Sequence, residues 1–311
     1  MNLTPQNNTN LFGFNNFFLN LKKLHDQNLL PNKIIFSGDK GIGKSTLAFH
    51  LTNYIYSVNE KNKYNFNNNV ILNDNYSFNL VAKNNHPNFF LIDNDEEKSS
   101  IQISKIREMI NFTNKSSFNA EFKIILIDNI EYLNTNSVNA LLKVVEEPNN
   151  KIYFFLIHNS KTKILETLKS RCIKFNLYLN SDEKSKIINK LLNNNFYLNL
   201  NEDFKNLYNS PGNIISLYNF FIEHNINEDI SIDDFLKLII NKSLYKKNTY
   251  LKINLSYFIQ LYFSKKINHL NSKSKIYYLY KYFLLKISNC NKYNLDFESI
   301  LIEFNGKVLN G

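Results

Sequence analysis

The residues with the clearest chemical meaning form a glycine-rich run, GDKGIGKS at 38–45, which matches G-x-x-x-x-G-K-[ST] at every fixed position. Gly38, Gly41 and Gly43 are three of only seven glycines in the chain. Glycine lets backbone N–H groups turn toward phosphate oxygens, and a following helix N-terminus adds partial positive charge. In such a loop Lys44 neutralises the β- and γ-phosphates and the Ser45 hydroxyl ligates Mg²⁺. The run therefore predicts a nucleotide site rather than a chance glycine turn.

A second group of candidates follows predicted strands further along the chain. Asp128 ends the apolar run from Lys123, where an acid in a parallel nucleotide-binding sheet holds Mg²⁺ through its water shell. The alternative is an ordinary acid in a turn. The next residue is Asn129, whereas hydrolytic members of this class carry a Glu that polarises water; an amide cannot act as a base. Glu131 is expected to be a surface acid that points elsewhere.

Alternating strands and helices are expected to position these residues. Buried strands are predicted at 34–36, 89–92, 124–127 and 152–157, and helices at 11–30, 47–56, 103–110 and 139–148. The Asn-dense residues 59–79 are expected to be an irregular connection. Strand, loop and helix in this order predict an α/β domain with a parallel sheet flanked by helices. His158 and Asn159 end the last strand, where Asn159 could touch the γ-phosphate; Thr46 completes the predicted nucleotide-binding set.

Composition narrows the class of protein. At 311 residues the chain is expected to form two or three domains, and no apolar stretch reaches the roughly 20 residues that span a bilayer, which favours a soluble, cytoplasmic protein. Cys172 and Cys290 are the only cysteines, which excludes a four-cysteine zinc module. Twelve lysines and no acid lie between 235 and 295. They could attract DNA phosphates, or be solvated faces in a chain whose composition is typical of AT-rich coding DNA.

Four segments together resemble the AAA+ subunits of sliding-clamp loaders, and above all those of the delta-prime type in bacterial DNA polymerase III. They are 38–45, 124–128, 139–148 and the Ser-Arg-Cys motif at 170–172, within a resemblance that covers about residues 10–178. It implies that Arg171 is an arginine finger for the ATP site of a neighbouring subunit, a role suited to a planar, always charged guanidinium. The alternative is a surface arginine at a helix end. Arg107, the other arginine, is expected to pair with an acid at the surface or to serve a helix interface.

The resemblance also implies the domain plan and the partners. It divides the chain into a AAA+ core at 1–178, a helical lid at 179–225 and an all-α collar at 226–311, with residues 225–229 as the linker. The collar packs against its counterparts in a ring with the gamma/tau motor subunits and the delta subunit, which opens the sliding clamp and places it on primed DNA. The aromatic stripes of the collar are predicted to form a helix-bundle core rather than a surface for stacking bases.

Departures from the motor subunits bear on catalysis. Asn129 replaces the catalytic Glu, the Asn-rich segment lacks the usual cysteine module, the chain stops earlier, and residues 210–213 lack a basic lid residue. The sequence thus favours a subunit of a DNA polymerase holoenzyme that binds ATP and Mg²⁺ weakly or structurally, without zinc, and hydrolyses little. Two alternatives remain: a self-contained AAA+ or P-loop ATPase of DNA repair or remodelling that uses Glu131 or another acid, and a nucleotide-free scaffold.

Overall fold

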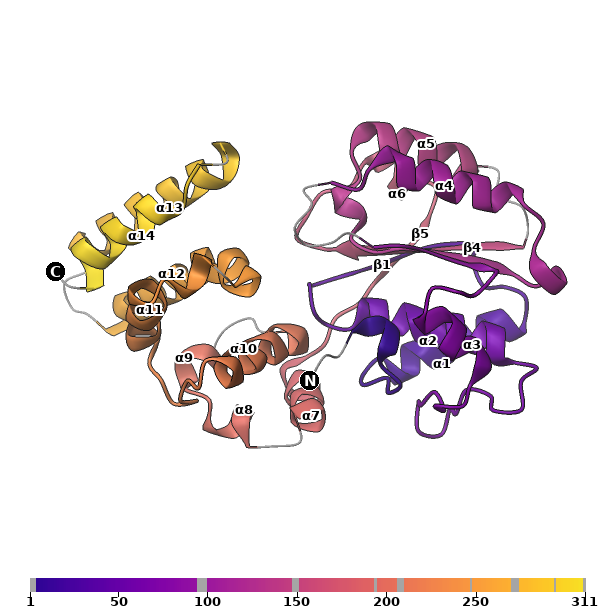
Figure 1. Cartoon of the computed structure of the whole chain (residues 1–311), viewed down its shortest axis with the longest axis horizontal. Coiled ribbons are helices and arrows are strands. Elements are labelled where there is room, and N and C mark those ends of the chain that lie inside the picture. The colour runs from indigo at the N-terminus through magenta and orange to yellow at the C-terminus, as the bar shows by residue number, and fades with distance from the viewer. Residues whose placement is uncertain are drawn as a thin grey trace. The chain divides into compact units, whose positions relative to one another are not determined.

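The computed structural model describes residues 4–93, 100–146, 151–192, 195–205, 210–246, 248–269, 274–293 and 295–309. Its Cα positions group the chain into two compact units, drawn together in Figure 1. The first comprises Met1–Ile187 with Ser210–Gly212, and the second comprises Ile188–Asn209 with Asn213–Gly311. The expected division into core, lid and collar stays a prediction.

The first unit is built on a five-stranded parallel sheet in the order β2-β3-β4-β1-β5. Its strands are β1 (Lys33–Gly38), β2 (Phe89–Ile92), β3 (Lys123–Ile127), β4 (Ile152–Asn159) and β5 (Ile173–Asn176). Figure 1 shows α1 (Asn15–Asp26), α2 (Lys44–Ser57) and α3 (Tyr76–Ala82) on one face, and α4 (Ile103–Asn114), α5 (Thr135–Glu146) and α6 (Glu166–Lys169) on the other. The predicted fold class, a parallel sheet flanked by helices and followed by a helical region, is confirmed.

Apolar content explains which strands were predictable. The central strands β1, β3 and β4 are almost wholly buried, because a parallel sheet covered on both faces needs near-continuous apolar runs. The fifth strand, β5, was not predicted. It is a short edge strand that pairs only with β1, and half of the Ile173 surface is exposed, so its sequence carries no continuous apolar signal.

Local differences from the expected elements have local causes. Helix α1 is shorter than the predicted 11–30, and the residue before it, Phe14, has a left-handed backbone. The connection at 59–79 already contains the start of α3, which begins where the Asn75 side chain accepts the backbone N–H of Phe78 at 2.7 Å. Helix α5 is described as far as Glu146, so the predicted stop at Pro148 lies outside the described residues.

The second unit is helical in its described part. Its helices are α8 (Phe196–Asn199), α9 (Glu202–Lys205), α11 (Ile232–Asn241), α12 (Thr249–His269), α13 (Ser274–Tyr293) and α14 (Glu298–Phe304), and it includes most of α10 (Pro211–Glu223) and the end of α7 (Ser181–Leu192). One apolar core joins segments assigned by sequence to lid and to collar: the Phe204 ring meets those of Phe235 and Phe258 at centroid distances of 5.3 and 6.3 Å.

The aromatic stripes divide between core and surface. The phenylalanines at 235, 258, 263 and 283 are fully buried, as expected of a helix-bundle core. Tyr277 and Tyr278 on α13 are instead 49% and 67% exposed, so the core interpretation is wrong for these two rings. No helix in the described ranges combines the length and apolar character needed to cross a membrane.

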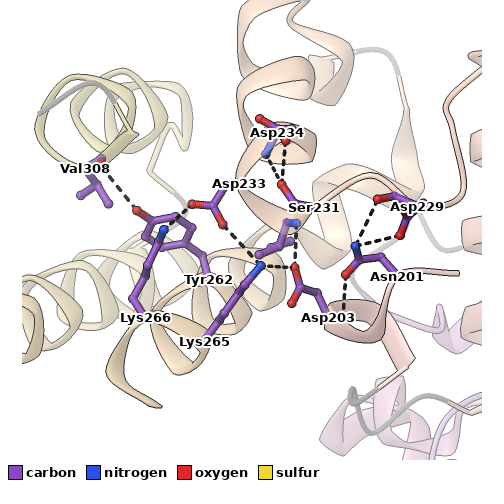
Figure 2. Close-up of polar contacts among 11 residues, drawn as sticks. Asn201, Asp203, Asp229, Ser231, Asp233, Asp234, Tyr262, Lys265, Lys266 and Val308 are labelled. Atoms are coloured by element: carbon purple, nitrogen blue, oxygen red, sulfur yellow. Dashed lines mark hydrogen bonds and ion pairs between the residues drawn. The ribbon is translucent and has the colours of Figure 1, made fainter. Parts of the chain in front are cut away.

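A polar network ties α9 to α11 and α12 within the second unit (Figure 2). The Asp203 carboxylate accepts a hydrogen bond from Lys265 Nζ at 2.6 Å and another from the backbone N–H of Ile232 at 3.1 Å. Asp233 pairs with Lys266 at 2.6 Å. These contacts fasten the start of α11, just after the expected linker at 225–229, to α9 and α12.

We predict that Asp203→Asn lowers the free energy of unfolding of the second unit by about 1 to 3 kcal/mol, because an ammonium and an N–H would lose a mostly buried charged acceptor. Urea denaturation followed by circular dichroism measures the change. The control is Glu202→Gln next to it, whose carboxylate is 74% exposed and pairs with Lys205. Equal stabilities of the two variants would contradict the prediction.

Candidate nucleotide-binding site

The glycine-rich loop leaves β1 and enters α2, as predicted. Gly41 and Gly43 have φ angles of +80° and +96°, in the left-handed region that favours glycine. Gly38 is required for a different reason: a Cβ there would lie 2.4 Å from the carbonyl oxygen of Leu177. The left-handed backbone at Gly41 and Gly43 and the close approach of Gly38 to Leu177 thus both require glycine. The loop can present its backbone amides to a ligand.

Lys44 is held inside this loop. Its Nζ donates hydrogen bonds to the carbonyl oxygens of Gly38 at 2.9 Å and Asp39 at 2.7 Å. Burial lowers the Lys44 pKa to about 8, although the carboxylates of Asp128, Glu131 and Asp39 act in the opposite direction. The ammonium is therefore poorly solvated, and an anionic phosphate would stabilise it better than two carbonyl groups do.

Ser45 and Asp128 come together from α2 and from the end of β3. The Ser45 hydroxyl donates to Asp128 Oδ2 at 2.6 Å, and the backbone N–H of Asn129 donates to Oδ1 at 2.9 Å. Burial raises the Asp128 pKa to about 6. A partly buried carboxylate beside a hydroxyl, close to a phosphate loop, fits an oxygen-liganded Mg²⁺. The residues present therefore fit a magnesium nucleotide. Thr46 is half-buried in the same first turn of α2.

Asn129 has a left-handed backbone, with φ +56° and ψ +56°, at the start of the 3₁₀ turn Ile130–Tyr132. Asparagine adopts this conformation more readily than other residues with a side chain, apart from aspartate. The asparagine at position 129 is thus suited to its backbone conformation.

Glu131 was expected to be a surface acid pointing elsewhere, and this expectation is wrong. Its side chain is half-buried, and Oε2 accepts the backbone N–H of Asn159 at 3.2 Å. It lies in the short 3₁₀ turn Ile130–Tyr132, which begins directly after the left-handed Asn129. Sequence periodicity does not reveal a single such turn, and so Glu131 was missed as a site residue.

At the end of β4 the two polar residues differ in role. His158 accepts the Ser37 hydroxyl at Nδ1 (2.9 Å) and donates from Nε2 to the Thr162 carbonyl (3.1 Å), while burial lowers its pKa. Its ring is thus engaged by neighbouring backbone and side chains. The Asn159 side chain accepts the backbone N–H of Lys161 at 3.2 Å. A contact between Asn159 and a γ-phosphate stays a prediction.

The first turn of α10 also reaches the loop. The backbone N–H of Gly212 donates to the Gly41 carbonyl at 2.9 Å, and a Cβ on Gly212 would lie 3.0 Å from Gly41 Cα. The backbones of Gly212 and Gly41 are therefore in contact. Gly212 belongs to the segment 210–213, which carries no basic residue. A side chain at position 212 would press on the phosphate loop.

The two arginines lie on other elements. Arg171 follows α6, where Nε and a terminal nitrogen approach Glu146 Oε1 at 2.8 and 2.7 Å, and another nitrogen donates to the Thr167 carbonyl at 2.9 Å. Arg107 is exposed on α4. Among the described residues, no three His, Cys, Asp or Glu side chains gather as a metal-binding group.

Comparisons with known proteins agree with one another. The family described as "DNA polymerase III, delta subunit" matches residues 14–180. DNA polymerase III subunit delta' of Buchnera aphidicola subsp. Schizaphis graminum is 30% identical over 242 residues, which span 75% of this chain and 70% of that protein. The same subunit of Buchnera aphidicola subsp. Baizongia pistaciae is 34% identical over 152 residues, 47% of this chain and 44% of that protein.

A solved structure of a DNA polymerase III gamma subunit-related protein from Thermotoga maritima aligns with 91% of this chain and 96% of that one, at 14% identity and a TM-score of 0.49. The sequence comparisons cover the described site, since residues 14–180 include the phosphate loop, Asp128, Asn159 and Arg171.

We predict that Asp128→Asn stabilises the chain in the absence of nucleotide and Mg²⁺. Because the Asp128 pKa of about 6 lies above its ordinary value of 3.8, its contribution to folding is fully present below pH 3.8 and is lost as pH rises through about 6. The amide cannot ionise. The variant should exceed the wild type by about 1 to 3 kcal/mol in free energy of unfolding at pH 7, with the gap narrowing toward pH 4.

Denaturant unfolding at several pH values tests this prediction. The control is Asp74→Asn, the same chemical change at an exposed position, which is expected to shift stability by less than about 0.5 kcal/mol. A variant at position 128 less stable than wild type at pH 7 would mean that its carboxylate is not destabilised by burial.

Proposed function

The chain belongs to the DNA polymerase III delta-subunit family, as a delta-prime-like clamp-loader subunit, and from this premise we propose that it acts as a stationary partner in that loader. It binds ATP and Mg²⁺ weakly or structurally, and it donates Arg171 to the ATP site of a neighbouring gamma/tau motor subunit. With the delta subunit, this assembly would open the sliding clamp and load it onto primed DNA.

The observation that carries the proposal is a complete phosphate site without the usual base. The contacts of Lys44 with the loop and of Ser45 with Asp128 support a site for a magnesium nucleotide. Asn129 supplies no group that could take a proton from water. Binding with little turnover follows from this combination, and it suits a subunit whose nucleotide stabilises its own fold and interfaces.

The proposed role of Arg171 draws on its chemistry and exposure. The guanidinium keeps its charge at any physiological pH and can contact two phosphate oxygens at once. Its pair with Glu146 is 36% and 49% exposed on the two side chains. An exposed pair contributes about 0 to 1 kcal/mol, so releasing Arg171 toward a neighbour's phosphate costs little. Glu146 would then hold the side chain in an extended position until the subunits meet.

The domain roles complete the proposal. Residues 179–225 would serve as the lid, and residues 226–311 as the collar through which unlike subunits form a ring. The long helices α12 and α13 supply the surface for this packing, including the exposed rings of Tyr277 and Tyr278.

A second candidate is a self-contained ATPase, and the position of Glu131 favours it. The carboxylate lies at the end of β4, against the backbone of Asn159, within the same site. It could accept a proton from water there. This candidate predicts steady ATP turnover by the isolated chain that Glu131→Gln abolishes.

We predict that Arg171→Ala leaves this subunit folded and able to enter the complex, but lowers DNA-stimulated ATP hydrolysis by the reconstituted loader at least about twofold, because one motor site loses its transition-state cation. Arg171→Lys should also lower the stimulated hydrolysis, since an ammonium lacks the planar, two-pronged donor geometry of a guanidinium. Steady-state phosphate release with clamp and primed DNA measures both.

Arg107→Ala is the matched control, because it removes the chain's other arginine from an exposed position on α4. It should leave stimulated hydrolysis unchanged. If Arg171→Ala and Arg107→Ala complexes turn over as fast as wild type, the arginine-finger role is refuted.

A further inference from the structure

The Glu131 carboxylate lies where the terminal phosphate of a bound nucleotide is expected. It lies at the carboxyl edge of the sheet, between Asp128 after β3 and Asn159 at the end of β4. We propose that the Glu131 carboxylate repels a γ-phosphate, so that this site binds a nucleoside diphosphate in preference to a triphosphate. The inference rests on the proposed nucleotide site and names the ligand class that the site prefers.

The carboxylate is held in place by the sheet. Strand β3 ends at Ile127, opposite Leu156, so its backbone does not extend as far as Asn159 on β4. Glu131 Oε2 accepts the Asn159 N–H in its stead, at 3.2 Å. This bond keeps the charge of Glu131 beside Asn159, the residue expected to contact the γ-phosphate.

The charges around Lys44 show why an additional phosphate would be disfavoured. The carboxylates of Asp128, Glu131 and Asp39 all act on the Lys44 ammonium. A Mg²⁺ between Ser45 and Asp128 would offset the charge of Asp128. Asp39 is already close to Lys161, at 3.7 Å. Glu131 would meet the terminal phosphate while its own hydrogen bond comes from an uncharged N–H.

A diphosphate and a triphosphate differ at this point. In such a loop the amides and Lys44 would hold the β-phosphate, and a γ-phosphate would lie between Lys44 and the strand ends that carry Asp128 and Asn159. Repulsion between the additional charge and a fixed carboxylate across several ångströms corresponds to roughly a three- to tenfold loss of affinity. The first turn of α10 offers no cation in compensation, because Gly212 meets the loop there with its backbone.

Isothermal titration calorimetry of the full chain with Mg-ADP and with the non-hydrolysable Mg-AMPPNP tests the proposal. Wild type should bind the diphosphate more tightly. Glu131→Gln keeps an oxygen acceptor for the Asn159 N–H but removes the charge, and it should reduce the ADP/AMPPNP preference roughly three- to tenfold by tightening AMPPNP. Glu166→Gln, on an 82% exposed carboxylate of α6, is the matched control and should keep the wild-type ratio.

Each outcome decides the matter. A wild-type chain that prefers the triphosphate analogue, or an unchanged ratio in Glu131→Gln while both ligands still bind, overturns this inference and leaves the proposed function standing. Turnover of ATP that Glu131→Gln abolishes at an unchanged ratio would make Glu131 a base and also overturn it. Absence of binding by either nucleotide to wild type would contradict both this inference and the nucleotide site of the proposed function.

Discussion

The hydrogen bond between the Ser45 hydroxyl and the Asp128 carboxylate is the contact on which the rest of the site depends. It joins the first turn of α2 to the end of β3, two elements brought together only by the sheet order β3-β4-β1. The glycine loop leads directly into the first turn of α2, and at its start Gly38 lies so close to the Leu177 carbonyl that no Cβ would fit. Sheet, loop and helix are thus positioned around one hydroxyl and one carboxylate.

Burial changes the protonation equilibria of the two charged residues in this arrangement. Lys44 and Asp128 both lie where water solvates them poorly. The pKa of Lys44 is therefore lowered and that of Asp128 is raised, and both shifts favour the neutral form. A phosphate beside the ammonium and a cation beside the carboxylate would each supply what is missing. The site is therefore electrostatically prepared for a magnesium nucleotide, while Asn129 leaves it without the usual base. This combination supports the proposal that the chain binds a nucleotide with little turnover.

The sequence predicted those features that are local or strongly apolar. The glycine loop follows from residue type and spacing, and the central strands follow from unbroken apolar runs such as Ile124–Ile127. Features that depend on tertiary contacts were out of reach. The edge strand β5 has too few apolar residues to stand out, and the place of Glu131 depends on one 3₁₀ turn. The contact between Gly212 and Gly41 joins residues 171 positions apart, and no periodicity encodes it.

A single-turnover experiment on the isolated chain tests the central claim most directly. Excess protein is mixed with radiolabelled ATP and Mg²⁺, and both the bound nucleotide and the released phosphate are followed over time. The account predicts saturable, magnesium-dependent binding, with ATP recovered intact from the complex. Rapid release of phosphate from bound ATP, or no bound nucleotide at saturating protein, would contradict it.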